Sequence, residues 1–65
     1  MSEAVVTPAW IDDDGDLFDY RTGVMLGQAT EAQLDASGEE ADLDTGVFQA
    51  ELTPSQAAML LALQL

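Results

Sequence analysis

Three side chains that carry much enzyme chemistry are missing from this chain of 65 residues. It has no cysteine, no histidine and no lysine, and Arg21 is its one basic residue. The chain therefore lacks disulfides, a thiol nucleophile and a nitrogen base that works near neutral pH. Paired carboxylates can serve as acid and base in glycoside hydrolysis, but so short a chain leaves little room for the required cleft. We expect no enzymatic activity.

Long hydrophobic runs are missing too. The longest apolar run, residues 57–63, is far shorter than the roughly 20 residues that a membrane-spanning helix needs. Residues 1–4 lack the basic start and the apolar run of a signal peptide. The apolar content of 48% is too high for a disordered acidic tail. We expect one folded domain over residues 1–65, located in the cytoplasm.

Acidic side chains dominate what is present. The sequence has 13 Asp and Glu residues and a formal net charge of −12. Charge of one sign destabilises a compact fold, and a domain of this size buries only about 60% of its unfolded surface. Such a charge indicates a negative surface that matches a positive one. Nucleic acid and anionic membranes would be repelled, so we expect a basic, nucleic-acid-binding protein or complex as the partner.

The acidic residues form two clusters, and no charged side chain follows Glu51. The first cluster is Asp12, Asp13, Asp14, Asp16 and Asp19. The second is Glu31, Asp35, Glu39, Glu40, Asp42 and Asp44. We expect the partner-binding residues to be Asp12, Asp13, Asp14, Asp16, Asp19, Glu39, Glu40, Asp42 and Asp44.

Short runs rich in β-branched and aromatic residues predict four strands, over residues 4–11, 17–20, 24–28 and 46–52. Pro8 interrupts the first run, and a proline suits an edge strand or a strand entry. Asp14-Gly15 predicts a two-residue hairpin turn. In the last run, Phe48 and Ala50 fall on one face.

Two capping boxes predict two helices. Thr30 with Gln33 begins the first helix, which we expect to end at Gly38, and Thr53 with Gln56 begins the second, over residues 54–65. The expected fold is α+β, with a small, mainly antiparallel sheet of three to four strands. Two short helices accompany the sheet, and the C-terminal one packs on it.

One motif occurs twice with the same spacing. Asp-x-x-Thr-Gly-Val stands at residues 19–24 and 42–47, and in both places a capping box follows after five residues. Each copy predicts a turn, a strand and a capped helix. Two explanations remain open: a coincidence among common turn and cap residues, or a repeated strand-and-helix unit.

The acidic run at residues 12–16 suggests calcium, but the EF-hand pattern fails. Placing Gly15 at position 6 of such a loop puts Trp10 at position 1, where a carboxylate is required. Three readings of the run remain: loose binding of divalent ions, a solvated hairpin turn, or a partner-binding turn. We expect no cofactor. Arg21 is expected to hold Asp19 or another carboxylate.

Apolar side chains suggest a core and a second surface. We expect the aromatic residues in the core, with Tyr20 the exception that could anchor a partner: Trp10, Phe18, Tyr20 and Phe48. The last helix is apolar on nearly every side, so one face packs on the sheet. The opposite face is covered by a second copy or a target protein, or its small alanines make it tolerable in water.

In size, acidity and lack of catalytic residues, the chain resembles phage-encoded DNA-mimic proteins, particularly small anti-CRISPR inhibitors. The resemblance covers the whole chain as composition, and no residue roles carry over from it. It implies a protein target in the host cell, such as the DNA-recognising surface of a CRISPR effector complex; restriction enzymes, nucleoid proteins and repair nucleases are equally basic targets. Two alternatives remain: a structural or adaptor subunit that forms a homodimer through residues 54–65, and adaptation to high salt.

Overall fold

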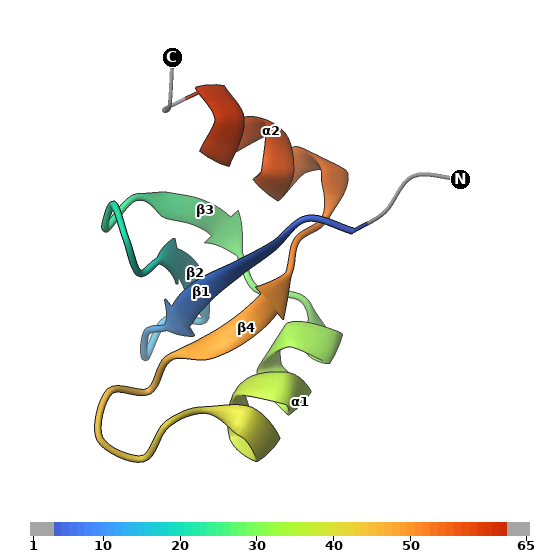
Figure 1. The fold of residues 1–65 in the computed structure, drawn as a ribbon. Helices are drawn as coiled ribbons and strands as arrows, with labels where there is room; N and C mark the ends of the chain where they lie inside the picture. Colours follow the sequence, from blue (N-terminus) through green and yellow to red (C-terminus); the bar gives the residue numbers. More distant parts are fainter. Residues whose placement is uncertain (1–3, 63–65) are drawn as a thin grey trace.

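Four strands form one antiparallel sheet, and two helices pack against it (Figure 1). The computed structural model describes residues 4–62. The elements are β1 (Val6–Ile11), β2 (Asp16–Asp19), β3 (Met25–Gln28), α1 (Glu31–Glu40), β4 (Phe48–Glu51) and α2 (Pro54–Ala62). The strand order is β3-β2-β1-β4, with α1 against β4 and α2 against β3. The predicted α+β fold, with its C-terminal helix on the sheet, is confirmed.

The hydrophobic core lies on one face of the sheet. Its strand residues, which alternate with outward-facing ones, are Ala9, Leu17, Leu26, Phe48 and Ala50. Leu60 from α2 and Ala36 from α1 pack against this cluster, so both helices cover the same face. Side chains at alternate positions of a strand point to opposite faces, and within residues 4–62 no helix covers the other face of the sheet.

The prediction of an edge position for Pro8 is wrong, because β1 lies between β2 and β4. The carbonyl of Pro8 accepts a hydrogen bond from the backbone N–H of Tyr20 at 2.9 Å. In an antiparallel pair, the N–H of a residue points to the same side as its carbonyl. A backbone N–H at position 8, which proline lacks, would therefore point toward Tyr20. Because β2 ends at Asp19, one residue before Tyr20, the missing N–H falls at the end of the β1–β2 pairing and not within it.

Two other boundaries differ from their predictions. The β1–β2 hairpin has a three-residue loop, because the N–H of Asp12 donates to the carbonyl of Asp16 and the N–H of Gly15 donates to that of Asp12. Gly15 has a φ of 84°, which places the glycine at the left-handed position of such a loop. Helix α1 continues through Gly38 to Glu40, since Gly38 does not adopt a positive φ.

Both copies of the Asp-x-x-Thr-Gly-Val motif form the same turn. In the first copy, the N–H of Asp19 donates to the carbonyl of Val24 at 2.9 Å, and the N–H of Gly23 donates to the carbonyl of Asp19 at 2.8 Å. At residues 42–47, the same two bonds measure 2.9 and 2.8 Å. The φ angles of Gly23 and Gly46 are 76° and 73°. The repeated sequence therefore builds the same turn, strand and capped helix twice.

The two capping glutamines, Gln33 and Gln56, are buried and hydrogen-bonded to each other. Gln33 Nε2 donates to Gln56 Oε1 at 2.6 Å, and Gln56 Nε2 donates to Gln33 Oε1 at 3.0 Å. Their remaining amide hydrogens reach the carbonyls of Glu51 and Gln28, at 2.8 and 3.3 Å. Each Oε1 also accepts the N–H of the threonine that caps its own helix, at 2.9 Å. Both buried amides thus use all their hydrogen-bonding capacity.

Candidate partner-binding surface

The strand pairing brings the two acidic segments to one end of the sheet. Ala9 pairs with Phe48 in antiparallel register, so residues just before Phe48 lie beside those just after Ala9. The β1–β2 loop and the α1–β4 loop therefore share an end, and both lie at the lower left of Figure 1. Arg21, in the β2–β3 turn, lies at the opposite end of β2. The sheet is thus acidic at one end, with the only cation at the other.

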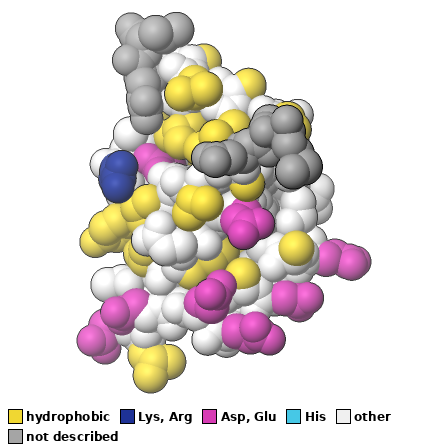
Figure 2. Space-filling model, turned by 45° about the vertical axis from the view of Figure 1, so that its right-hand side comes forward, with side chains coloured by type: hydrophobic (Ala, Val, Ile, Leu, Met, Phe, Trp, Pro, Cys, Tyr) yellow, Lys and Arg dark blue, Asp and Glu magenta, His cyan; other side chains and the backbone are white. Residues whose placement is uncertain are grey.

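Most of the predicted partner-binding carboxylates are accessible. Those of Asp12 and Asp16 are half-buried, and the exposed ones are Asp13, Asp14, Glu39, Glu40, Asp42 and Asp44. Figure 2 shows most of the acidic side chains of one face in its lower half, with apolar side chains above and among them. The dark blue basic side chain lies in the upper half of the same view, beside an acidic side chain but away from most of the others.

Two aspartates shape the loops that carry the other charges. Asp12 Oδ1 accepts the backbone N–H groups of Asp14 and Asp16, at 3.0 and 2.9 Å. Asp42 Oδ1 accepts that of Asp44 at 2.7 Å, and that of Thr45 at 3.4 Å. Such bonds between a side chain and the following backbone fix the course of a turn. The exposed carboxylates of both loops are therefore held on ordered backbone.

Asp19 does not belong to this surface, so its predicted partner-binding role is wrong. Its side chain is 1% exposed, and it accepts hydrogen bonds from Thr7 Oγ1 at 2.7 Å and from Thr22 N and Oγ1 at 3.0 and 2.8 Å. Burial alone would raise the pKa of Asp19, but these bonds, helped by the charge of Arg21, hold it below its usual value. Thr7 and Thr22 hold this carboxylate by hydrogen bonds, and the exposed Arg21 acts on it only through its charge.

The aromatic residues divide between the two faces of the sheet. Phe48 is buried and Tyr20 is 55% exposed, as predicted. The core assignment of Trp10 and Phe18 is wrong, because both are half-buried on the face without a helix. They pair across β1 and β2 and stack, with ring centroids 4.4 Å apart. Alternation along β2 explains the placement, since Leu17 takes the core position beside Phe18.

Helix α2 keeps an apolar outer face. Leu60 is buried against the sheet, while Met59 and Leu61 are 48% and 56% exposed. The prediction of one packed and one uncovered face is therefore confirmed over Pro54–Ala62. Residues 63–65 lie outside the part that the structure describes. What covers the outer face stays a prediction.

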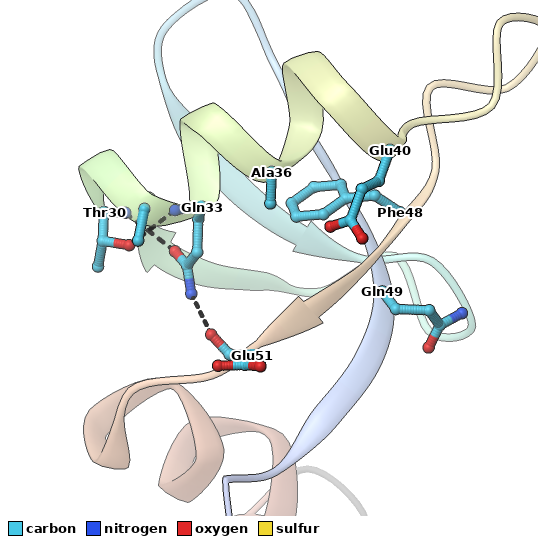
Figure 3. A pocket seen from close by; sticks show the side chains of 8 residues that line it. Thr30, Gln33, Ala36, Glu40, Phe48, Gln49 and Glu51 are labelled. Atoms are coloured by element: carbon cyan, nitrogen blue, oxygen red, sulfur yellow. Dashed lines mark hydrogen bonds between the residues drawn. The ribbon is translucent and has the colours of Figure 1, made fainter.

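A hollow of about 260 Å³ lies between α1 and β4 (Figure 3). Ala36 and Phe48 line its apolar part, and Glu40, Gln49 and Glu51 are among its polar residues. Sequence patterns did not single out Glu51 or this site. Local sequence patterns could not predict the hollow, because it forms only where α1 packs beside the edge strand β4 in the folded protein.

Between residues 4 and 62, no three acidic side chains lie close enough together to hold a metal ion. Over the same span, the helices are too short or too polar to cross a membrane. Comparisons with protein-family models, with curated proteins and with solved structures found no match to this chain.

Proposed function

We propose that this protein is a binding inhibitor that presents carboxylates where a nucleic-acid-binding protein accepts phosphates. The target is a basic DNA-binding surface, such as that of a CRISPR effector complex. The observation that carries the proposal is the gathering of the β1–β2 and α1–β4 loops at one end of the sheet, away from Arg21. B-DNA carries one negative charge per about 1.7 Å of its axis, so closely spaced carboxylates can replace a short stretch of it.

Ordered loops support this mode of action. The carboxylates of Asp12 and Asp42 fix the two loops through backbone hydrogen bonds before any partner arrives. Groups that are already held in place lose less conformational entropy on binding, which favours affinity. Opposite charge on the two surfaces also speeds their encounter. The inhibitor then acts by occupying the site, without chemistry.

Removing charge from the acidic end should weaken binding. We expect Asp13→Asn with Asp14→Asn, or Glu39→Gln with Asp44→Asn, to reduce affinity about fivefold, at about 0.5 kcal/mol per charge. None of these four side chains accepts a described hydrogen bond, so the fold should survive. Affinity capture from a bacterial lysate at low and high salt, with duplex DNA as competitor, measures the effect. A DNA-handling complex should be retained at low salt and displaced by DNA.

The matched control removes two charges from the outer side of α1, with Glu31→Gln and Asp35→Asn. It should bind as wild type does. Equal binding by all the double variants would contradict mimicry. Thermal melts of each variant at low and high salt exclude unfolding as the cause. They also test adaptation to high salt, which predicts that wild type unfolds when salt is removed.

A second candidate function, an adaptor subunit, rests on the exposed Met59 and Leu61 of α2. Under this alternative, wild type forms a homodimer through residues 54–65, and Met59→Gln with Leu61→Gln makes it monomeric. Under mimicry, the same double variant should bind the basic target as tightly as wild type. Sedimentation equilibrium gives the mass, and the capture assay gives the binding. Loss of both assembly and capture in this variant would favour the adaptor function.

A further inference from the structure

We propose that the face of the sheet opposite the helices is the apolar centre of the interface with the basic partner. This open face carries apolar side chains that alternate with buried ones along three strands: Val6, Pro8, Trp10, Phe18 and Met25. The occupant is a protein surface on which apolar side chains lie between cationic ones. This inference rests on the proposed function, since the open face and the acidic loops contact the same partner.

Three neighbouring strands place large apolar side chains in one row on the open face. Trp10 pairs with Phe18 across β1 and β2, and Phe18 pairs with Met25 across β2 and β3. The two rings stack, and Met25 beside them is 50% exposed. Val6, which is 51% exposed, and Pro8 extend the apolar surface along β1. Trp, Phe and Met are enriched at protein interfaces, and contiguous exposed apolar patches mark interaction sites.

The charges on the open face suit a cationic partner. Within the four strands, its charged side chains are both acidic: Glu51 pairs with Val6, and Asp16 lies two residues before Phe18 on β2. The acidic β1–β2 loop lies at the end of the same strands, and Arg21 lies in the turn at the other end of β2. Cationic groups around an apolar centre would pair with these carboxylates when docking removes them from water.

The same charges argue against two other occupants. A second copy would bring the same carboxylates and a further net charge of −12 to the face, so like charges would meet. Single-stranded nucleic acid stacks its bases on exposed aromatic rings, but it also needs a positively charged groove for its phosphates. A basic protein surface suits both the rings and the carboxylates, because arginine stacks on aromatic rings and pairs with carboxylates.

The test uses the fluorescence of Trp10, the chain's one tryptophan, which reports on the open face without a label. The probe is a peptide with three leucines between two pairs of arginines. We expect saturable binding with a shift of the Trp10 emission to shorter wavelength, because docking removes the indole from water. A control peptide with serines in place of the leucines should bind about tenfold more weakly. A second control with glutamates in place of the arginines should not bind.

Substitutions on the open face should weaken the probe selectively. We expect Val6→Thr with Met25→Gln to reduce its affinity about tenfold, because both side chains supply exposed apolar area. Threonine keeps the β-branched shape of valine, and a thermal melt shows that the double variant is folded. The matched control is Met59→Gln with Leu61→Gln, which makes the same kind of change on α2 and should bind the probe as wild type does.

Several results would overturn this docking surface. Equal binding of the serine peptide, or no saturable binding of the leucine probe, would show that the apolar side chains are not read. Saturable quenching of Trp10 by oligothymidylate would make the open face a platform for nucleic-acid bases. A wild-type dimer in sedimentation equilibrium that Val6→Thr with Met25→Gln makes monomeric would show that a second copy covers the face.

The docking surface and the proposed function fail in distinguishable ways. If the open-face variant is captured as wild type is, and capture still needs Asp13 and Asp14, mimicry stands and the docking surface falls. If the probe binds as expected but duplex DNA displaces nothing from the captured protein, the docking surface stands and mimicry falls.

Discussion

Replacing Gln33 with alanine is expected to lower the free energy of unfolding by about 3 kcal/mol. The substitution removes half of a capping box and leaves the N–H of Thr30, the carbonyl of Glu51 and the amide of Gln56 without their partners. A buried polar group that loses its partner costs about 1 to 3 kcal/mol, because it was desolvated on folding. The alanine also leaves space that its neighbours fill only in part.

The loss is large for so small a domain. Stabilities near 0.1 kcal/mol per residue give about 6 kcal/mol for this chain, so about half would disappear. Each kcal/mol shifts the melting temperature of such a domain by about 4 to 8 °C, and we expect a fall of about 20 °C. Urea unfolding followed by circular dichroism measures the free energy, and a thermal melt measures the shift.

The paired geometry adds a sharper expectation. Gln56→Ala should cost as much as Gln33→Ala, and the double variant should cost about 1 to 2 kcal/mol less than their sum, since the pair is lost only once. Gln28→Ala is the matched control, because its side chain is exposed while its carbonyl still serves Gln56. Additive losses at residues 33 and 56 would show that the two amides act independently.

Asp19→Asn should cost about 2 kcal/mol at neutral pH and much less in acid. The wild-type carboxylate accepts three hydrogen bonds that an amide, with one accepting oxygen, cannot all replace. Because these bonds lower its pKa in the folded state, the carboxylate stabilises the protein above its unfolded pKa of about 3.9. That contribution is lost as the pH falls through the folded pKa.

Comparing wild type with Asp19→Asn isolates the contribution of the Asp19 carboxylate to stability. Acid also relieves repulsion among the other carboxylates, but that effect is common to wild type and variant. Urea unfolding at neutral pH and at about pH 3 should therefore show a gap between wild type and variant that narrows in acid. Asp42→Asn is the matched control, because Asp42 begins the second copy of the motif but is exposed. A gap of constant size would contradict the assigned role of Asp19.

Local signals identified most of the elements. The two Thr-x-x-Gln boxes marked both helix starts, since a capping box acts within one turn. Alternation placed Phe48 and Ala50 on the core side of β4. The sequence did not reveal that Gln33 and Gln56 bind each other. That contact joins residues 23 positions apart and depends on the packing of both helices.

The candidate surface was predictable in part for the same reason. Charge runs showed where acid gathers along the chain, and strand pairing then set which runs meet. Asp19 stands within an acidic run, but its burial depends on Thr7, a residue from the neighbouring strand. Trp10 and Phe18 are residue types typical of a core, but Ala9 and Leu17 take the core positions beside them, so alternation along β1 and β2 turns both rings to the other face.

The Gln33–Gln56 pair also bears on whether one copy of the repeat could fold without the other. Each helix packs against the strand of the other copy of the repeat, and each cap is completed by the other cap. Each copy supplies one partner for its own buried amide, the N–H of the capping threonine, and the other partners come from the strand and the helix of the other copy. Intermediates with a single copy in place would carry unmet hydrogen bonds, so the folding unit is the interlocked pair. We therefore expect a repeat that looks modular along the chain to fold as a single cooperative unit.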